Sequence, residues 1–466
     1  MELRLSPRMS VPPDLSSPMP PSTSARHRVW LHVGTLLDGT STGPIRDAHV
    51  VYDCDAIRFV GAAGRTPPRE FVREGQVSPD LEAPDCTLLP GLIEAHAHLF
   101  LEGGELDSDR RAAYLQQTPA QLLAAARERL AKLVHLGVTA VRDAGDKDGV
   151  GLALSKHYAT QREIAGSPLA VGARSASKLA AYEQAPALLM PYVDSPGAAI
   201  HHKGRYGSFM AEPLENFASL RTCVEARVAA GADRIKLIPT GIINFKKGAV
   251  TSEPQMTTDE VTQLVLAARS FDRQTFAHAS GDVGIDRAIE GGVDSVEHGF
   301  FLRDDQLARM RDRQIAWVPT FAPVQKQIDH ADVMGWDADV VANLRRILEQ
   351  HAASLVKAQA MGVLIVAGSD AGSYGVAHGL GFLYELELME RAGLSPSAVI
   401  KAATGTSAGR LGFKEKFGCV APGFRSRFIL TRFSPLETVT NLRRPRTIVF
   451  DGEVFETDEN PDTLNL

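Results

Sequence analysis

The stretch Leu-Pro-Gly-Leu-Ile-Glu-Ala-His-Ala-His, residues 89–98, joins a turn to a short apolar run that carries two histidines at alternate positions. Alternate side chains of a β-strand share one face, so His96 and His98 are placed where two ring nitrogens can bind one metal ion. Two histidines can also simply fill a protein interior, and the pair alone is a weak signal. Its meaning depends on the sequence that follows.

From Pro90-Gly91 onward, short apolar runs alternate with amphipathic stretches, which is the pattern of β-strand and α-helix units. The predicted strands are Leu92–His98, Val138–Asp143, Leu169–Arg174, Arg234–Pro239, Thr275–His278, Ser295–His298, Ala316–Thr320 and Leu364–Asp370. Predicted helices between them include Pro119–Leu136, Asp259–Ser270 and Ala338–Met361. Eight strand–helix units predict an α/β fold, a (β/α)8 TIM-type barrel over residues 90–411.

The two ends of the chain have a different composition. Residues 1–26 are rich in proline and serine and predict a flexible leader. Residues 27–89 and 412–466 contain short β-rich runs separated by turn residues. These runs are Val29–Val33, His49–Tyr52, Ile57–Val60, Phe428–Thr431 and Thr447–Phe450. We expect both ends to pair into one small β-sandwich domain beside the barrel.

The overall charge excludes some classes of partner. The chain has 466 residues, with 50 Lys and Arg against 56 Asp and Glu, for a net charge of −6. Nucleic acids and anionic membranes both attract a clustered excess of basic residues, so we expect neither, and a small-molecule substrate is favoured. No apolar run is long enough to span a bilayer or to form a secretory signal, which predicts a cytoplasmic protein. The oligomeric state stays open, with a homo-oligomer as one option.

The cysteines carry no metal or disulfide pattern. Cys54, Cys86, Cys223 and Cys419 are spread along the chain without a C-x-x-C pair. We expect them to be small buried hydrophobic residues.

Other chemically active side chains stand at the carboxyl ends of predicted strands, where barrel enzymes build their active sites. They are Lys236, His278, His298 and Asp370, on the fourth, fifth, sixth and eighth strands. Taken singly, each has a structural explanation, such as a lysine that extends to the rim or an aspartate that caps a helix. Together with His96 and His98, they would be costly to bury at one end of a barrel without a cation to compensate them. A metal centre is the simplest explanation.

Six motifs stand in order along the predicted barrel. They are Leu-Pro-Gly-Leu-Ile-Glu-Ala-His-Ala-His (89–98), Gly-Val-Thr-Ala-Val-Arg-Asp (137–143), Gly-Ala-Asp-Arg-Ile-Lys (231–236), Ala-His-Ala-Ser-Gly (277–281), Glu-His-Gly (297–299) and Gly-Ser-Asp-Ala-Gly (368–372). Together they resemble the motifs of the metal-dependent amidohydrolase superfamily. Their order is most similar to the branch with imidazolonepropionase-related proteins and Xaa-Pro dipeptidases. Chain length and the loop after Lys236 weakly resemble the phenylurea and molinate hydrolases of that branch.

The resemblance implies a metal-dependent hydrolase of carbon–nitrogen bonds that holds one or two divalent ions. It implies that His96, His98 and Asp370 bind one ion and that His278 and His298 bind the other. Lys236, carboxylated by carbon dioxide to a carbamate, would bridge both, and Asp370 would also act as general base and then general acid. Zinc is favoured, and cobalt, manganese or iron would also suit such ligands.

Two departures from the family pattern stand out. Position 94 is Glu where the family usually has Asp, and Ser426-Arg427-Phe428 replaces Ala-Asp-Leu. The loop at residues 239–245 is also more apolar than the dipeptidase-like members would have. Candidate substrate contacts beyond strand ends are His202, Thr240 and Tyr374.

The apolar residues expected around the mouth are Ile242, Ile243, Phe245, Phe300, Phe301 and Phe321. They favour a small, largely neutral amide, urea or carbamate, such as a phenylurea or thiocarbamate herbicide. A Xaa-Pro dipeptidase or an N-acyl amino-acid hydrolase is the alternative, with Lys203 or Arg205 opposite the substrate carboxylate. A single-metal deaminase is disfavoured by Lys236. A non-catalytic binding protein on the same barrel is disfavoured by the complete ligand set.

Overall fold

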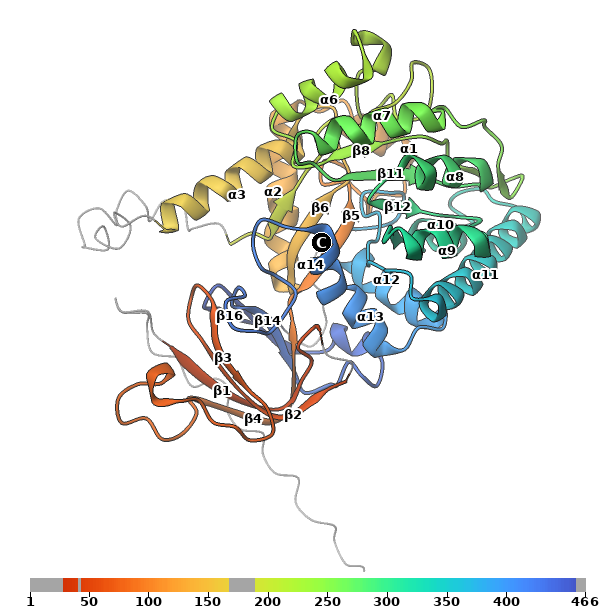
Figure 1. Ribbon diagram of the computed structural model, residues 1–466. Coiled ribbons are helices and arrows are strands. Elements are labelled where there is room, and N and C mark those ends of the chain that lie inside the picture. The colour runs from red at the N-terminus through yellow and green to blue at the C-terminus, as the bar shows by residue number, and fades with distance from the viewer. Residues whose placement is uncertain (1–27, 41–42, 167–188, 458–466) are drawn as a thin grey trace, which may run out of the picture.

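The computed structural model describes residues 28–40, 43–166 and 189–457, and Figure 1 shows a barrel next to a smaller β-sheet unit. The predicted leader at residues 1–26 and the predicted third strand, Leu169–Arg174, lie outside the described residues. Over the described residues, no helix has the length and apolar character to cross a membrane.

The barrel is built from parallel strands in two hydrogen-bonded groups. The first group runs in the order β5 (Leu92–Ala97), β6 (Val138–Asp143) and β7 (Tyr192–Asp194). The second runs in the order β8 (Ile235–Leu237), β11 (Thr275–Ala279), β12 (Ser295–His298) and β13 (Ala316–Val318). The place beside β6 thus belongs to β7, a three-residue strand that the sequence did not predict. Pro196 and Gly197 follow it closely, and a run this short gives no periodicity signal.

Irregular segments connect the two groups at both open edges. Between β7 and β8, Ile200 accepts from Ile238 and donates to Lys236 through the backbone, at 3.0 and 2.9 Å. The predicted eighth strand, Leu364–Asp370, is an extended segment held by isolated bridges rather than a regular strand. Its backbone pairs with Trp317 on one side and with Ala95 and His96 on the other. The barrel predicted from the sequence is therefore confirmed, with seven of its eight positions taken by the strands β5, β6, β7, β8, β11, β12 and β13 and the eighth by the irregular segment 364–370.

Helices surround the barrel (Figure 1). Their bounds are α1 Ser108–Tyr114, α2 Pro119–His135, α3 Val150–Gly166, α6 Leu220–Ala229, α7 Thr258–Arg269, α8 Asp282–Gly291, α9 Asp304–Asp312, α10 Ala322–Asp329, α11 Ala338–Met361, α12 Leu380–Arg391, α13 Pro396–Ala402 and α14 Gly405–Leu411. Short 3-10 turns are Arg69–Phe71, Leu214–Asn216 and Val439–Arg443. A hairpin of β9 (Ile243–Asn244) and β10 (Ala249–Val250) follows β8.

Local sequence explains where the long helices begin and end. Asp337 accepts the backbone N–H of Val340 at the start of α11, and Gly362 ends that helix with a left-handed φ of 80°. Thr118 and Gln121 form a reciprocal capping box at the start of α2. All three helices predicted by name are present within one residue at each end.

The small unit is one seven-stranded sheet in the order β16-β15-β14-β4-β1-β2-β3. Its strands are β1 Val29–Leu36, β2 Ile45–Tyr52, β3 Ile57–Gly61, β4 Leu81–Pro90, β14 Arg427–Thr431, β15 Arg446–Phe450 and β16 Glu453–Glu456. The ten-residue β4 pairs with β1 through its earlier residues and with β14 through Thr87–Pro90. The two chain ends therefore share a domain as predicted, in a single continuous sheet where the sequence suggested a sandwich.

The cysteine prediction is confirmed at three positions. Cys86, Cys223 and Cys419 are buried, whereas Cys54 is exposed and the prediction was wrong there. Cys54 lies between β2 and β3, in a turn that the chain makes at the surface.

Candidate metal centre

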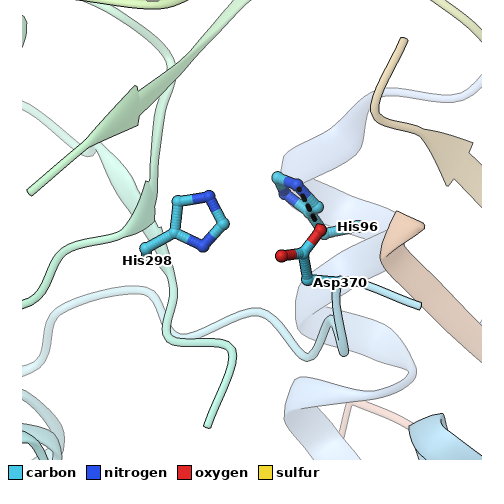
Figure 2. A group of neighbouring side chains, drawn as sticks. All are labelled: His96, His298 and Asp370. Carbon is cyan, nitrogen blue, oxygen red and sulfur yellow. Dashed lines mark ion pairs between the residues drawn. The ribbon is translucent and has the colours of Figure 1, made fainter. Parts of the chain in front are cut away.

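Three of the predicted ligands converge at the carboxyl end of the barrel. One ligand atom each from His96, His298 and Asp370 lies within 4.8 Å of the others. Figure 2 shows the two imidazoles facing a common space beside the Asp370 carboxylate. Oδ1 of Asp370 lies 3.5 Å from Nε2 of His96 and 3.6 Å from Nε2 of His98. These contacts bring β5, β12 and the eighth segment to one site.

The remaining predicted ligands adjoin this group. The His278 and His298 rings have centroids 4.5 Å apart, and Lys236 extends its Nζ to 4.6 Å from the Phe276 ring centre. Lys236 is 2% exposed and His278 is 8% exposed. The structure therefore gathers all six predicted residues in one buried region.

Hydrogen bonds leave one nitrogen of each histidine available for a metal. Nδ1 of His98 donates to the carbonyl of Gly145 at 3.0 Å, which leaves its Nε2 unprotonated. In His278 the two nitrogens exchange roles: Nε2 lies 3.3 Å from the carbonyl of Gly241, and Nδ1 is the nitrogen available for a metal. Nδ1 of His298 meets the hydroxyl of Thr320 at 2.8 Å.

His96 has the strongest partner. Its Nδ1 donates to Oε2 of Glu297 at 2.5 Å, and its Nε2 is buried without a hydrogen-bond partner. A buried nitrogen without a partner is costly unless something binds it. The donor set of neutral imidazoles, a carboxylate and a lysine therefore fits one or two divalent ions.

Burial also sets the charge of the ligands. It lowers the pKa of His98 and of His278 to about 3, with the nearby Lys236 adding to the effect, so both rings are neutral at physiological pH. Burial lowers the pKa of Lys236 to about 8, and it raises the pKa of Asp370 to about 7 in the metal-free protein. Neutral imidazoles are the form that binds a metal.

The backbone is strained at three positions of the site. His298, Thr320 and Asp370 have left-handed φ angles of 67°, 52° and 56°. Such angles are costly for residues other than glycine, and most so for a β-branched threonine. At His298 the turn also ends the regular alternation of side chains, so that His298 and the preceding Glu297 both face the site region.

Glu94, the departure from the family pattern, has a structural role. Its Oε1 accepts the backbone N–H groups of His96 and Ser369 at 3.0 and 2.9 Å, and its Oε2 accepts the Ser369 hydroxyl at 2.6 Å. This carboxyl group therefore ties β5 to the eighth segment. Its longer side chain is accommodated without becoming a ligand.

The sequence analysis did not single out two further residues at the site, Glu297 and Arg142. Both lie in motifs quoted above. The feature of the sequence that could have identified them is an ionisable side chain at a position of a barrel strand that faces inward. Arg142 is 1% exposed and Glu297 is fully buried. Nη2 of Arg142 donates to Oε2 of Glu297 at 2.7 Å.

The three side chains predicted to contact the substrate interact with other residues of the protein. His202 has Nδ1 at 2.9 Å from Glu215 and Nε2 at 3.3 Å from Glu260. Thr240 is buried, donates to the carbonyl of His278 at 3.3 Å, and so supports that ligand. Tyr374 donates to the carbonyl of Leu106 and lies beneath the Arg111 guanidinium. Their binding role stays a prediction.

A cavity of about 430 Å³ adjoins the metal centre. It is lined by Gly204, Arg205, Tyr206, Gly241, Ile242, Ile243, Asn244, Thr251, Ser252 and Gln255. Tyr206 packs its ring 5.1 Å from the His278 ring, and Gly241 contacts the same histidine. The volume suits a small organic molecule.

The phenylalanines expected at the mouth lie elsewhere. Phe300 stacks on His351 of α11 with ring centres 4.1 Å apart, and Phe321 packs on the same ring at 4.6 Å. Phe245 and Phe301 join a cluster with α10 and α11. None of the four lines this cavity, so that part of the prediction was wrong: Phe300 and Phe321 are buried against His351, whereas Phe245 and Phe301 are partly buried in the cluster beside α10 and α11.

Comparisons with known proteins find a family model and related sequences that match most of the chain. The sequence model of the family described as "Amidohydrolase family" matches residues 87–454. Ochratoxinase from Aspergillus niger is 24% identical over 444 residues, which cover 93% of this chain and 88% of that protein.

Solved structures share the fold. A Xaa-Pro dipeptidase with bound methionine in the active site has a TM-score of 0.72 and 23% identity, covering 92% of this chain and 100% of the other. Phenylurea hydrolase B has a TM-score of 0.65 and 16% identity, covering 91% of this chain and 96% of the other.

Proposed function

The chain belongs to the amidohydrolase family, and we propose that its substrate is a small, largely neutral amide, urea or carbamate. Membership makes the protein a metal-dependent hydrolase of carbon–nitrogen bonds. The choice of substrate class is the proposal. The observation that carries it is the cavity beside His278, whose wall includes Ile242, Ile243 and the ring of Tyr206.

The chemistry follows from the placement of Asp370. A divalent ion held by the histidines and Asp370 would polarise the scissile carbonyl and lower the pKa of a water molecule. Oδ1 of Asp370 faces the histidines, while Oδ2 accepts the Ser373 hydroxyl at 2.8 Å. The carboxylate is thereby oriented to take a proton from the attacking water and to deliver it to the leaving nitrogen.

Lys236 is proposed to carry a carboxylate group from carbon dioxide. Its burial favours the neutral amine, which is the nucleophilic form that can react with carbon dioxide. The resulting carbamate would offer two oxygens to ions at the His96 and His278 sides. Zinc is the ion we propose for the native protein.

The site also supports a second candidate, a hydrolase of carboxylate-bearing amides such as an Xaa-Pro dipeptide or an N-acyl amino acid. Arg205 lines the cavity and offers the one cationic side chain among the residues that line it. The guanidinium is exposed and donates to the carbonyl of Glu253. Solvent competes for an exposed charge, so this arrangement favours neutral substrates over carboxylates.

Metal analysis of the purified chain and a substrate screen test the proposal. Phenylureas, thiocarbamates and anilides would be compared with Xaa-Pro dipeptides and N-acyl amino acids by kcat/KM. We expect metal-dependent hydrolysis and higher kcat/KM on the neutral compounds. A preference for the carboxylates that Arg205→Ala abolishes, with Arg65→Ala in the small domain as a control, would establish the second candidate instead. Full activity after complete chelation would refute the metal mechanism.

A further inference from the structure

A fully buried carboxylate joins three strands of the barrel beneath the metal centre. Glu297 of β12 accepts hydrogen bonds from Nδ1 of His96 at 2.5 Å, Nη2 of Arg142 at 2.7 Å and Oγ of Ser295 at 2.5 Å. Arg142 comes from β6 and His96 from β5. Each oxygen of the carboxylate is thus engaged.

Arg142 is itself held in place. Its Nε donates to the carbonyl of Ala95 at 2.6 Å, and its Nη1 donates to the Ser295 hydroxyl at 2.9 Å. The guanidinium also lies 4.5 Å from the centre of the Phe276 ring. With every side of the guanidinium in contact, the Glu297 carboxylate that it binds has little freedom to rotate.

This arrangement decides which nitrogen His96 presents to the site. An ionised carboxylate only accepts hydrogen bonds, so the Nδ1 of His96 must carry the proton and Nε2 must carry the lone pair. Among the described ligand histidines, His98 and His278 rely on backbone carbonyls and His298 on a hydroxyl. His96 is distinguished by a charged partner, and a charged acceptor also makes the ring a better electron donor.

We propose that Arg142 and Glu297 are positioning residues that fix the tautomer and orientation of His96 for metal binding. The inference rests on the metal-dependent function given above. It extends that function to a pair of residues that touch no substrate and act through the ring of His96.

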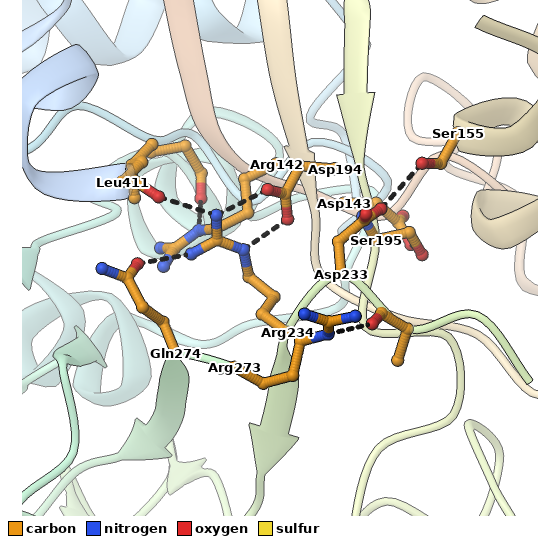
Figure 3. Close-up of polar contacts among 12 residues, drawn as sticks. Arg142, Asp143, Ser155, Asp194, Ser195, Asp233, Arg234, Arg273, Gln274 and Leu411 are labelled. Atoms are coloured by element: carbon orange, nitrogen blue, oxygen red, sulfur yellow. Dashed lines mark hydrogen bonds and ion pairs between the residues drawn. The ribbon is translucent and has the colours of Figure 1, made fainter. Parts of the chain in front are cut away.

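The test is the affinity of the metal-free full-length chain for Co²⁺, measured by competition with a chromophoric chelator. In Glu297→Gln, we expect Co²⁺ to bind about 10- to 100-fold more weakly and its visible absorption spectrum to change, because the charged acceptor is lost. The matched control is Asp194→Asn, which removes the carboxylate from a second buried arginine pair, Asp194–Arg234, in the same barrel. Figure 3 shows this pair beside Arg142, and in the described part of the chain neither Asp194 nor Arg234 has a hydrogen bond or ion pair to a ligand histidine.

Thermal unfolding is measured in parallel, since both variants leave a buried arginine without its carboxylate and should unfold at lower temperature. The proposal predicts weaker Co²⁺ binding in Glu297→Gln alone, with Asp194→Asn within about threefold of the unsubstituted protein. The proposal would be overturned if Glu297→Gln bound Co²⁺ as tightly as the unsubstituted protein, or if Asp194→Asn lost as much affinity for Co²⁺ as Glu297→Gln.

Ser295→Ala provides a second variant in case Glu297→Gln does not fold. It frees one oxygen of Glu297 and keeps the charge, so the affinity for Co²⁺ is expected to fall by about two- to tenfold, less than in Glu297→Gln. Unchanged affinity in Ser295→Ala would then count against the proposal. If the unsubstituted chain fails to bind Co²⁺, the metal-dependent function fails before the positioning role is reached.

Discussion

The buried pair of Asp194 and Arg234 should be essential for stability, because it spans the gap between the two strand groups of the barrel. Nη2 of Arg234 donates to Oδ2 of Asp194 at 2.5 Å, and Nε donates to Oδ1. The remaining guanidinium contacts are Gln274 at 3.1 Å and the carbonyl of Leu411 at 2.9 Å (Figure 3). Both charged side chains are almost fully buried, with 4% of each exposed. Asp194→Asn leaves an uncompensated buried guanidinium, which costs about 3–5 kcal/mol.

The assay is urea unfolding of the metal-free chain followed by both circular dichroism and tryptophan fluorescence. Coincident transitions allow free energies of unfolding to be compared. Glu225→Gln is the control, because it breaks an exposed helical pair with Arg221 and should cost less than about 0.5 kcal/mol. Replacing both partners, as Asp194→Leu with Arg234→Met, should recover much of the loss. A loss below about 1 kcal/mol in Asp194→Asn, or a double variant no more stable than the single one, would refute this reasoning.

Three further predictions concern the metal centre. Asp370→Asn should lower kcat by about 10²- to 10⁴-fold with an unchanged unfolding midpoint, because proton transfer is lost; retention of more than a tenth of the rate would exclude that role. The affinity for metal should fall about tenfold per pH unit below about pH 7, because Asp370 of the metal-free protein takes up a proton there and the metal must displace it. Titration with Co²⁺ measures this affinity, and a value that stays constant between pH 5 and 7 would contradict the prediction. Bicarbonate should increase the amount of metal bound by the unsubstituted protein, and more so above about pH 8, where the Lys236 amine is neutral. Metal binding by Lys236→Arg should not change with bicarbonate, because arginine stays protonated. An equal increase in the unsubstituted protein and in Lys236→Arg would exclude the carbamate.

Much of the site could be predicted from sequence because its signals are local. His96 and His98 share a face by the two-residue period of a strand, and His278, His298 and Asp370 each stand at the end of a predicted strand. The first and last residues of the helices could also be predicted from the sequence, because a capping residue such as Asp337 binds a residue only three positions away. The order of strands and helices then indicated the barrel.

The tertiary structure decided what depends on residues far apart in the chain. Glu297 meets His96 across 201 positions, and no local pattern reports such a contact. Phe300 and Phe321 pack around His351 because helix α11 closes over them, although their sequence positions place them at the mouth. The three-residue β7 forms because β6 offers it a hydrogen-bonding edge.

The sequence by itself therefore determined the fold class and the family and predicted the ligand set, because each follows from short-range periodicity and motif order. The tertiary structure alone decided which nitrogen of each histidine is free, which side chains line the cavity and which buried charges compensate one another. These depend on closure of the barrel, which brings strands from distant parts of the chain within hydrogen-bond distance and excludes water from between them.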